Sequence, residues 1–158
     1  IVGYGHSPEH ISLHCPSLDL LIAGDMLLPS ISTNISVWAT EPDGNPLKLF
    51  LASLSRFEPL PAHTRVLPSH GRPFVGIQPR IDWLRWHHQQ RLDALLVFCS
   101  EPKTAVESLP VLFERELDAY QLFFAVGEAI AHLNYLWHAG QLLRQQDDSG
   151  VYRFIRVL

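Results

Sequence analysis

Two stretches with the composition of β-strands end directly on residues that commonly bind metal ions. The apolar segment at 18–23 is followed by Asp25, and the short segment at 65–68 is followed by His70. Near the N-terminus, His6 lies in a short loop just before a third such stretch. Because a rigid sheet holds the loops at its strand ends, we expect these three side chains to lie near one another.

The chemistry of these residue types suits zinc and related metal ions. Such ions bind imidazole nitrogens and carboxylate oxygens, and a catalytic site keeps one coordination position open for water. Water bound there ionises near neutral pH and becomes a nucleophile. An isolated histidine is nevertheless more often a surface residue or a hydrogen-bonded core residue than a metal ligand.

Three short motifs resemble, in order and spacing, the second half of a metallo-β-lactamase-fold hydrolase. They are Gly-His-Ser-Pro-Glu-His at 5–10, Gly-Asp at 24–25 and Ser-His-Gly at 69–71. The resemblance implies that His6 completes the ligand set of a first metal ion and that His70 binds a second. It implies that Asp25 bridges the two and is the catalytic residue, with zinc as the cofactor of the intact two-metal site.

The first half of that family's signature, an H-x-H-x-D-H motif, is absent from the sequence. The remaining ligands would be divided between two metal positions without filling either. We therefore expect the site to be partial or empty in this chain, and we expect no catalysis by the chain alone. Since Met26 is the only methionine, we also expect the chain to be a truncated portion of a longer protein.

The spacing of apolar residues predicts an α+β fold. A helix is expected to begin at Asn45-Pro46, because Asn is a good N-cap and Pro fits the first turn. A longer helix is expected over 77–98, with one apolar face. Strands are expected at 10–15, 18–23, 35–38 and 65–68.

The last third of the sequence predicts helices followed by a hairpin. Thr104–Glu107 and Asp118–Gln121 have the form of capping boxes, which begin helices. The second helix should run to His138, with its buried side at Phe123, Val126, Ile130, Leu133 and Trp137, and two strands should flank the turn at 147–150.

The resemblance divides the chain into two domains. Residues 1–99 correspond to the C-terminal half of a metallo-β-lactamase αββα sandwich. Residues 100–158 correspond to a winged-helix α/β module, which one branch of the superfamily carries. That branch includes the lactamase-like endoribonucleases and hydrolases resembling glyoxalase II.

Charge argues against duplex DNA as the partner of that module. The helix expected at 118–138 contains no Lys or Arg, and residues 101–158 hold five basic against eight acidic side chains. DNA-binding helices contact phosphates with Lys and Arg. The net charge of −4 likewise gives no general attraction to nucleic acid or to an anionic membrane.

Other histidines and the cysteines are weaker candidates. His10 occupies a position where the family often has a second histidine outside the metal's ligand set, orienting a ligand through a hydrogen bond. A bond from His10 to the backbone is an equally good expectation. His87 and His88 point about 100° apart on a helix and cannot chelate one ion. Cys15 and Cys99 are expected to be buried free thiols in a cytoplasmic protein.

Several classes of protein are disfavoured by missing motifs. No apolar segment is long enough to span a membrane, since Asp19 and Asp25 interrupt the longest one. No G-x-S-x-G elbow, G-x-G-x-x-G fingerprint or Walker loop occurs, and we expect no cofactor-binding residues besides the metal ligands.

The leading hypothesis is therefore the C-terminal portion of a zinc-dependent hydrolase. The parent would cleave an ester, thioester or phosphodiester of a small molecule or RNA through a metal-bound hydroxide. The alternative is a non-catalytic remnant that serves as an interaction or assembly module. Removing half of a two-sheet sandwich would leave apolar sheet surface uncovered, so we expect a homo-oligomer through that exposed sheet face.

Overall fold

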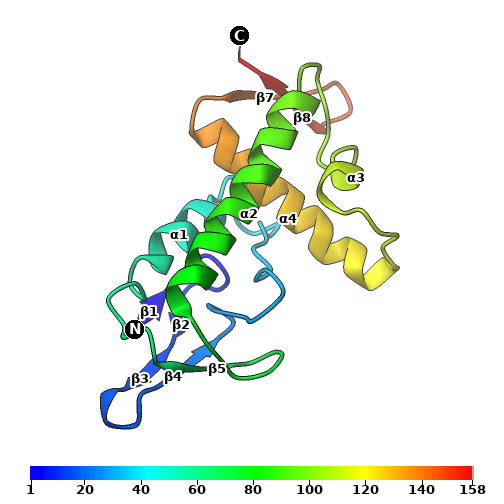
Figure 1. Ribbon diagram of the computed structural model, residues 1–158. Helices are drawn as coiled ribbons and strands as arrows, with labels where there is room; N and C mark the ends of the chain where they lie inside the picture. Colours follow the sequence, from blue (N-terminus) through cyan, green and yellow to red (C-terminus); the bar gives the residue numbers. More distant parts are fainter. Residues whose placement is uncertain (158) are drawn as a thin grey trace. The chain divides into compact units, whose positions relative to one another are not determined.

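A computed structural model describes residues 1–157 and falls into two units (Figure 1). The first unit comprises residues 1–34 and 48–87, and the second comprises residues 35–47 together with those from His88 onward. Residues of two helices, α1 (Pro46–Leu54) and α2 (Ile77–Phe98), are assigned to both units. The boundary predicted between residues 99 and 100 stays a prediction.

The first unit is built on a four-stranded sheet with the order β3-β4-β5-β6. The central strands β4 and β5 run parallel and pair Gly24 with Pro68, whereas the outer pairs are antiparallel. Their carboxyl ends therefore lie at the same edge of the sheet, where open parallel sheets place their ligand sites. The strand bounds are Leu13–Cys15, Leu20–Gly24, Arg65–Pro68 and Phe74–Val75.

The strand predicted over 10–15 is interrupted at Ser12. Its first part, β2 (His10–Ile11), pairs instead with β1 (Val2–Gly3) in a separate two-stranded sheet. The Ser12 side chain is fully buried, and its hydroxyl donates to the carbonyl of Ala23 at 3.1 Å. This hydrogen bond satisfies a buried polar group at the point where the two sheets separate.

The helix α1 begins where the sequence predicts, and α2 both begins and ends as predicted. Pro46 occupies the first turn of α1, and Leu47, Phe50 and Leu54 of that helix are fully buried. Along α2 the predicted apolar face is buried throughout, because side chains three or four positions apart share one side of a helix. Its members are Ile81, Leu84, His88, Leu92 and Leu95.

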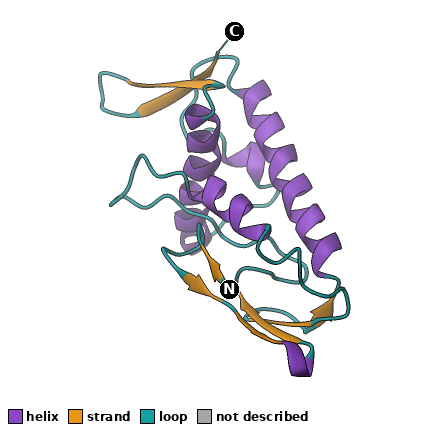
Figure 2. Ribbon diagram, turned by 90° about the vertical axis from the view of Figure 1, so that its left-hand side faces the viewer, coloured by secondary structure: helices purple, strands orange, loops and turns teal. Residues whose placement is uncertain are grey.

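The second unit contains two further helices and a hairpin, which Figure 2 shows as paired strands. The short helix α3 spans Leu109–Leu112, and the long helix α4 spans Ala119–His138 behind the predicted Asp118–Gln121 capping box. The strands β7 (Leu142–Gln146) and β8 (Tyr152–Arg156) pair antiparallel. The winged-helix assignment of this unit stays a prediction.

The predicted buried side of α4 is wrong in part. Phe123 is 63% exposed, whereas the small residues Ala125, Gly127 and Ala129 are buried. Segment 35–37 crosses the helix closely, since a Cβ at Gly127 would lie 2.8 Å from Ser36. A side chain larger than hydrogen at position 127 would therefore clash with this segment.

The strand predicted over 35–38 is also wrong. The amide of Val37 donates to the carbonyl of Gly127 on α4 at 3.0 Å, and the segment has no strand geometry. The run Ile-Ser-Val-Trp has strand-like composition, but its hydrogen bond is made with a helix. Tertiary packing therefore overrides local preference here.

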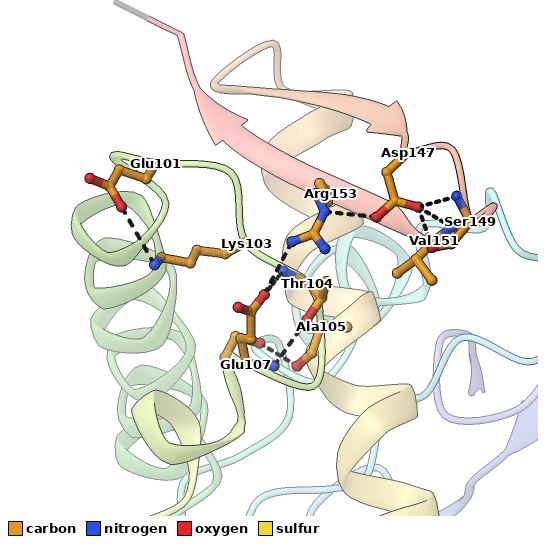
Figure 3. Close-up of polar contacts among 10 residues, drawn as sticks. Glu101, Lys103, Thr104, Ala105, Glu107, Asp147, Ser149, Val151 and Arg153 are labelled. Carbon is orange, nitrogen blue, oxygen red and sulfur yellow. Dashed lines mark hydrogen bonds and ion pairs between the residues drawn. The ribbon is translucent and has the colours of Figure 1, made fainter.

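The hairpin turn is stabilised by Asp147 (Figure 3). Its carboxylate accepts hydrogen bonds from the Ser149 hydroxyl at 2.6 Å, from the amide of Val151 at 3.0 Å and from Arg153 Nε at 2.8 Å. Hydrogen bonds from the Ser149 side chain, from the Val151 backbone and from Arg153 lower the pKa of Asp147 from 3.8 to about 2.

We expect these turn contacts to persist at pH 4 and to be lost as the pH falls toward 2. The folded-state pKa is depressed, so the stabilisation is present above 3.8 and disappears on protonation near pH 2. The amide shifts of Ser149 and Val151 in an NMR titration measure this transition. A midpoint near 3.8 would contradict it, and Asp147→Asn should show no such transition.

No helix within residues 1–157 combines the length and the apolar character that crossing a membrane requires.

Candidate metal centre

The structure brings His6, Asp25 and His70 together at the carboxyl edge of β4 and β5. His6 Nε2 lies 3.2 Å from Asp25 Oδ2, and His70 Nε2 lies 3.5 Å from Asp25 Oδ1. Asp25 is the central member, and each of its oxygens faces a different imidazole. The parallel pairing of β4 with β5 explains this arrangement, because Asp25 and His70 directly follow the two strands.

The orientation of the His6 ring is fixed by the backbone. His6 Nδ1 lies 2.8 Å from the carbonyl oxygen of Asn34, so Nδ1 carries a proton and donates it there. In the neutral ring, Nε2 then presents a lone pair toward the carboxylate of Asp25. Two acceptors that face each other at 3.2 Å repel unless a proton or a metal cation lies between them.

These contacts fit metal ligation. Two ligand atoms about 2.0–2.1 Å from one tetrahedral zinc ion lie roughly 3.3 Å apart. The distances from Asp25 to His6 and to His70 both lie near that value. Asn34 supplies the kind of carbonyl partner that metal-binding histidines use for their second ring nitrogen.

The three side chains do not by themselves complete one metal site. Within residues 1–157, no group of three or more His, Cys, Asp or Glu side chains is arranged to hold a metal ion. The reason lies in Asp25, whose two oxygens direct His6 and His70 to separate positions. The donor set therefore suits two half-sites that share a bridging carboxylate.

His10 holds the backbone of Asp25 in place. The amide of Asp25 donates to His10 Nε2 at 3.1 Å, so His10 contacts the candidate ligand through its main chain. Burial lowers the pKa of His10, and the neighbouring His6 lowers it further, against opposing effects of Asp25 and of a backbone hydrogen bond. A neutral imidazole is the form that can accept the Asp25 amide.

Two hydroxyl groups that the sequence motifs did not single out also hold Asp25. Ser69 donates to Asp25 Oδ1, and Thr33 donates to the Asp25 carbonyl. Ser69 precedes His70 in the Ser-His-Gly motif, so its closeness to the candidate ligands could have been predicted from the sequence. Thr33 lies in an irregular loop, where no spacing pattern points to it.

The remaining histidines lie in other contacts. His63 pairs with Asp19 at 3.0 Å on the surface of the first unit. In the second unit, His88 Nδ1 and His132 Nε2 approach to 3.0 Å, and His138 Nε2 bonds to the carbonyl of Asp43. His87 stacks on the ring of Trp83, with ring centres 4.6 Å apart, whereas His88 faces His132.

The two cysteines are free, but only Cys99 is buried as expected. Burial raises the pKa of the Cys99 thiol to about 11. Hydrogen bonding to the Ser17 hydroxyl lowers the pKa of Cys15, which is partly exposed. The prediction of a buried Cys15 is therefore wrong, because the strand ends at this residue and leaves it at the sheet margin.

We expect iodoacetamide to modify Cys15 roughly a hundredfold faster than Cys99 in the native protein, since the thiolate is the reactive form. Mass spectrometry of peptides from a timed reaction at pH 8 gives both rates. Cys15→Ser should remove the fast phase. Equal rates for both thiols would contradict the assigned environments.

Family models match both parts of the chain. Residues 1–70 match the model of the metallo-β-lactamase superfamily, and residues 92–157 match the model described as metallo-β-lactamase-like, C-terminal domain. Among curated proteins, the chain is similar to a probable metallo-hydrolase, YqjP, of Bacillus subtilis. The two are 29% identical over 141 residues, which is 84% of this chain and 42% of that protein.

Solved structures agree with this relationship. A β-lactamase domain protein from Burkholderia ambifaria matches with a TM-score of 0.96 and 52% identity, over 99% of this chain and 47% of that one. A metallo-β-lactamase family protein from Thermus thermophilus matches with a TM-score of 0.85 and 37% identity, over 99% of this chain and 48% of its own. The chain spans about half the length of these relatives.

Proposed function

Because the chain belongs to the metallo-β-lactamase superfamily, we propose that it forms one half of a metal-dependent hydrolase. His6, Asp25 and His70 are its contribution to the metal site, with zinc as the proposed metal. The substrate class is an ester, a thioester or a phosphodiester of a small molecule or RNA. A bound zinc ion would supply a water activated for attack near neutral pH.

The observation that carries the proposal is the double contact of Asp25. Its two carboxylate oxygens face two imidazoles whose Nε2 atoms are directed toward it. Asn34 fixes the tautomer of His6, and Ser69 holds Oδ1 of Asp25. These contacts hold the candidate ligand atoms in place, which would lower the cost of ordering them when a metal ion binds.

The experiment joins this chain to the half that its relatives possess. A chimera would place the preceding half of the Burkholderia ambifaria protein before Ile1, since this chain covers 47% of that one. We expect the zinc-loaded chimera to hydrolyse at least one nitrophenyl ester, thioester or phosphodiester. A chimera that binds zinc and cleaves none of them would contradict the proposal.

An interaction module is the second candidate, and the outer face of the sheet favours it. Leu13 and Ile22 are paired across β3 and β4 and are 60% and 51% exposed. Ile22 also pairs with Leu67 on β5, so three apolar side chains form one row across the sheet. Apolar rows of this kind are commonly covered by a partner, and we propose a second copy of this chain.

Leu13→Lys is therefore expected to weaken self-association by about tenfold or more, because it places a charge within the apolar row at its most exposed member. Sedimentation or light scattering over a range of protein concentrations measures the change. Leu49→Lys on α1, also at an exposed leucine, is the matched control and should leave association unchanged. A wild-type chain that remains monomeric would contradict the self-association proposal.

A further inference from the structure

A second concave site lies wholly within the second unit, and the metal centre does not involve it. It is a cavity of about 330 Å³ between α4, segment 37–42, the turn at 104–106 and the hairpin. Its walls are mainly apolar, with Val37, Val126, Ile130 and Phe154 among the lining residues. Sites for small molecules are usually apolar pockets of about 300–1,000 Å³ with a few polar groups.

Arg144 is the one positively charged residue among those that line this cavity. Its side chain is only 8% exposed, and its guanidinium carbon lies 3.7 Å from the ring centre of Trp137 and 4.3 Å from that of Tyr152. Aromatic rings on a guanidinium hold it by cation–π attraction. Arg144 therefore presents its donors in a fixed orientation.

The hydrogen bonds of Arg144 are unequal. Nη2 forms a close ion pair with Asp43, whose side chain is 66% exposed. Nη1 reaches the Pro42 carbonyl and Asn134 Oδ1 only at 3.4 Å, near the long limit for a hydrogen bond. Asp43 already balances the positive charge of Arg144. Nη1, whose present hydrogen bonds are long, could donate a shorter one to the acceptor of a ligand.

The turn at 104–107 and the hairpin are joined by the polar contacts in Figure 3. Arg153 bridges Asp147 of the hairpin turn and Glu107, and Glu107 exchanges hydrogen bonds with Thr104. Both Thr104 and Val151, which this network anchors, line the cavity. The hydrogen bonds of this network hold one side of the cavity in place.

We propose that this cavity binds an uncharged acyl compound, with its apolar chain against Val126 and Ile130 and its carbonyl oxygen accepting from Arg144 Nη1. The carbonyl is favoured over a carboxylate because Asp43 already neutralises the guanidinium, so a second anion would be repelled. A cationic head group is disfavoured, because a primary ammonium beside the Arg144 guanidinium would meet a charge of the same sign.

Isothermal titration calorimetry with three probes that share one alkyl chain tests the proposal. Octanamide carries a neutral carbonyl, octanoate a carboxylate and octylammonium a cation. We expect octanamide to bind most tightly, octanoate more weakly and octylammonium not at all. Octanamide that fails to bind, or that binds no better than octylammonium, would overturn the proposal.

Two variants locate the binding and identify the head-group contact. Val126→Phe fills the cavity and should weaken octanamide binding by about tenfold or more. Val97→Phe, at an exposed position on α2 outside the cavity, is the matched control and should bind as the wild type does. Equal octanamide affinities for the two variants would refute this location.

Asp43→Asn removes the balancing charge and should raise octanoate affinity by about threefold to fivefold, with little change for octanamide. An Asp43→Asn variant whose octanoate affinity is unchanged or lower would show that Arg144 does not contact the head group.

Discussion

Asp25→Asn, introduced into the chimera, is expected to lower zinc affinity by at least about a hundredfold. Partners that only orient metal ligands are worth about 10–100-fold in affinity, and Asp25 faces both candidate imidazoles directly. Asparagine keeps the shape of the side chain but removes its charge and one ligand oxygen. Hydrolysis should fall together with zinc content.

Asp19→Asn is the matched control for that result. Asp19 also faces a histidine, His63, but the pair lies on the surface away from the candidate site. Asparagine tolerates the left-handed backbone of residue 19, so the fold should be unaffected. Zinc affinities that fall equally in both variants would contradict a specific role for Asp25. Competition with a chromogenic chelator measures both.

The second large effect is that of Gly24→Ala, which we expect to destabilise the chain by about 2–5 kcal/mol. Gly24 has a φ of +55°, and a side chain in this region costs roughly 1–2 kcal/mol. A Cβ would also overlap the Cε1 and Nε2 atoms of the His10 ring. Moving that ring breaks its hydrogen bond with the Asp25 amide, which adds about 1–3 kcal/mol.

Two comparisons separate the backbone cost of Gly24→Ala from the cost of its overlap with His10, with the free energy of unfolding measured in urea. Gly140→Ala has a similar φ of +71° and no atom near the new Cβ, so it should cost only the backbone part. In a double-mutant cycle, Gly24→Ala should cost less in the His10→Ala background, because the overlap has been removed. Equal costs of Gly24→Ala in both backgrounds would contradict the contact.

The parts of this molecule that the sequence predicts well are those set by short-range patterns. The start of α1 follows from Asn45 and Pro46, and the bounds of α2 and β5 follow from their patterns of apolar residues. The convergence of Asp25 and His70 follows from two neighbouring strands that end together. Each of these depends on residues close in sequence or on a simple rule of sheet geometry.

The parts that escaped prediction depend on contacts between distant segments. The carbonyl of Asn34 orients His6, yet a backbone acceptor leaves no signature in side-chain types. Phe123 is 63% exposed and its ring lies 5.8 Å from that of Trp38, a contact between distant segments that amphipathic spacing does not reveal. The cavity beside Arg144 likewise combines residues from four separate stretches of the sequence, which no local pattern connects.

The most direct test of the account is the position of zinc in a crystal of the chimera, found by anomalous scattering at the zinc edge. We expect a peak within bonding distance of His6 Nε2 and Asp25 Oδ2, and a second peak beside His70 Nε2 and Asp25 Oδ1. Zinc bound elsewhere, with Asp25 in contact with no metal ion, would contradict the central claim.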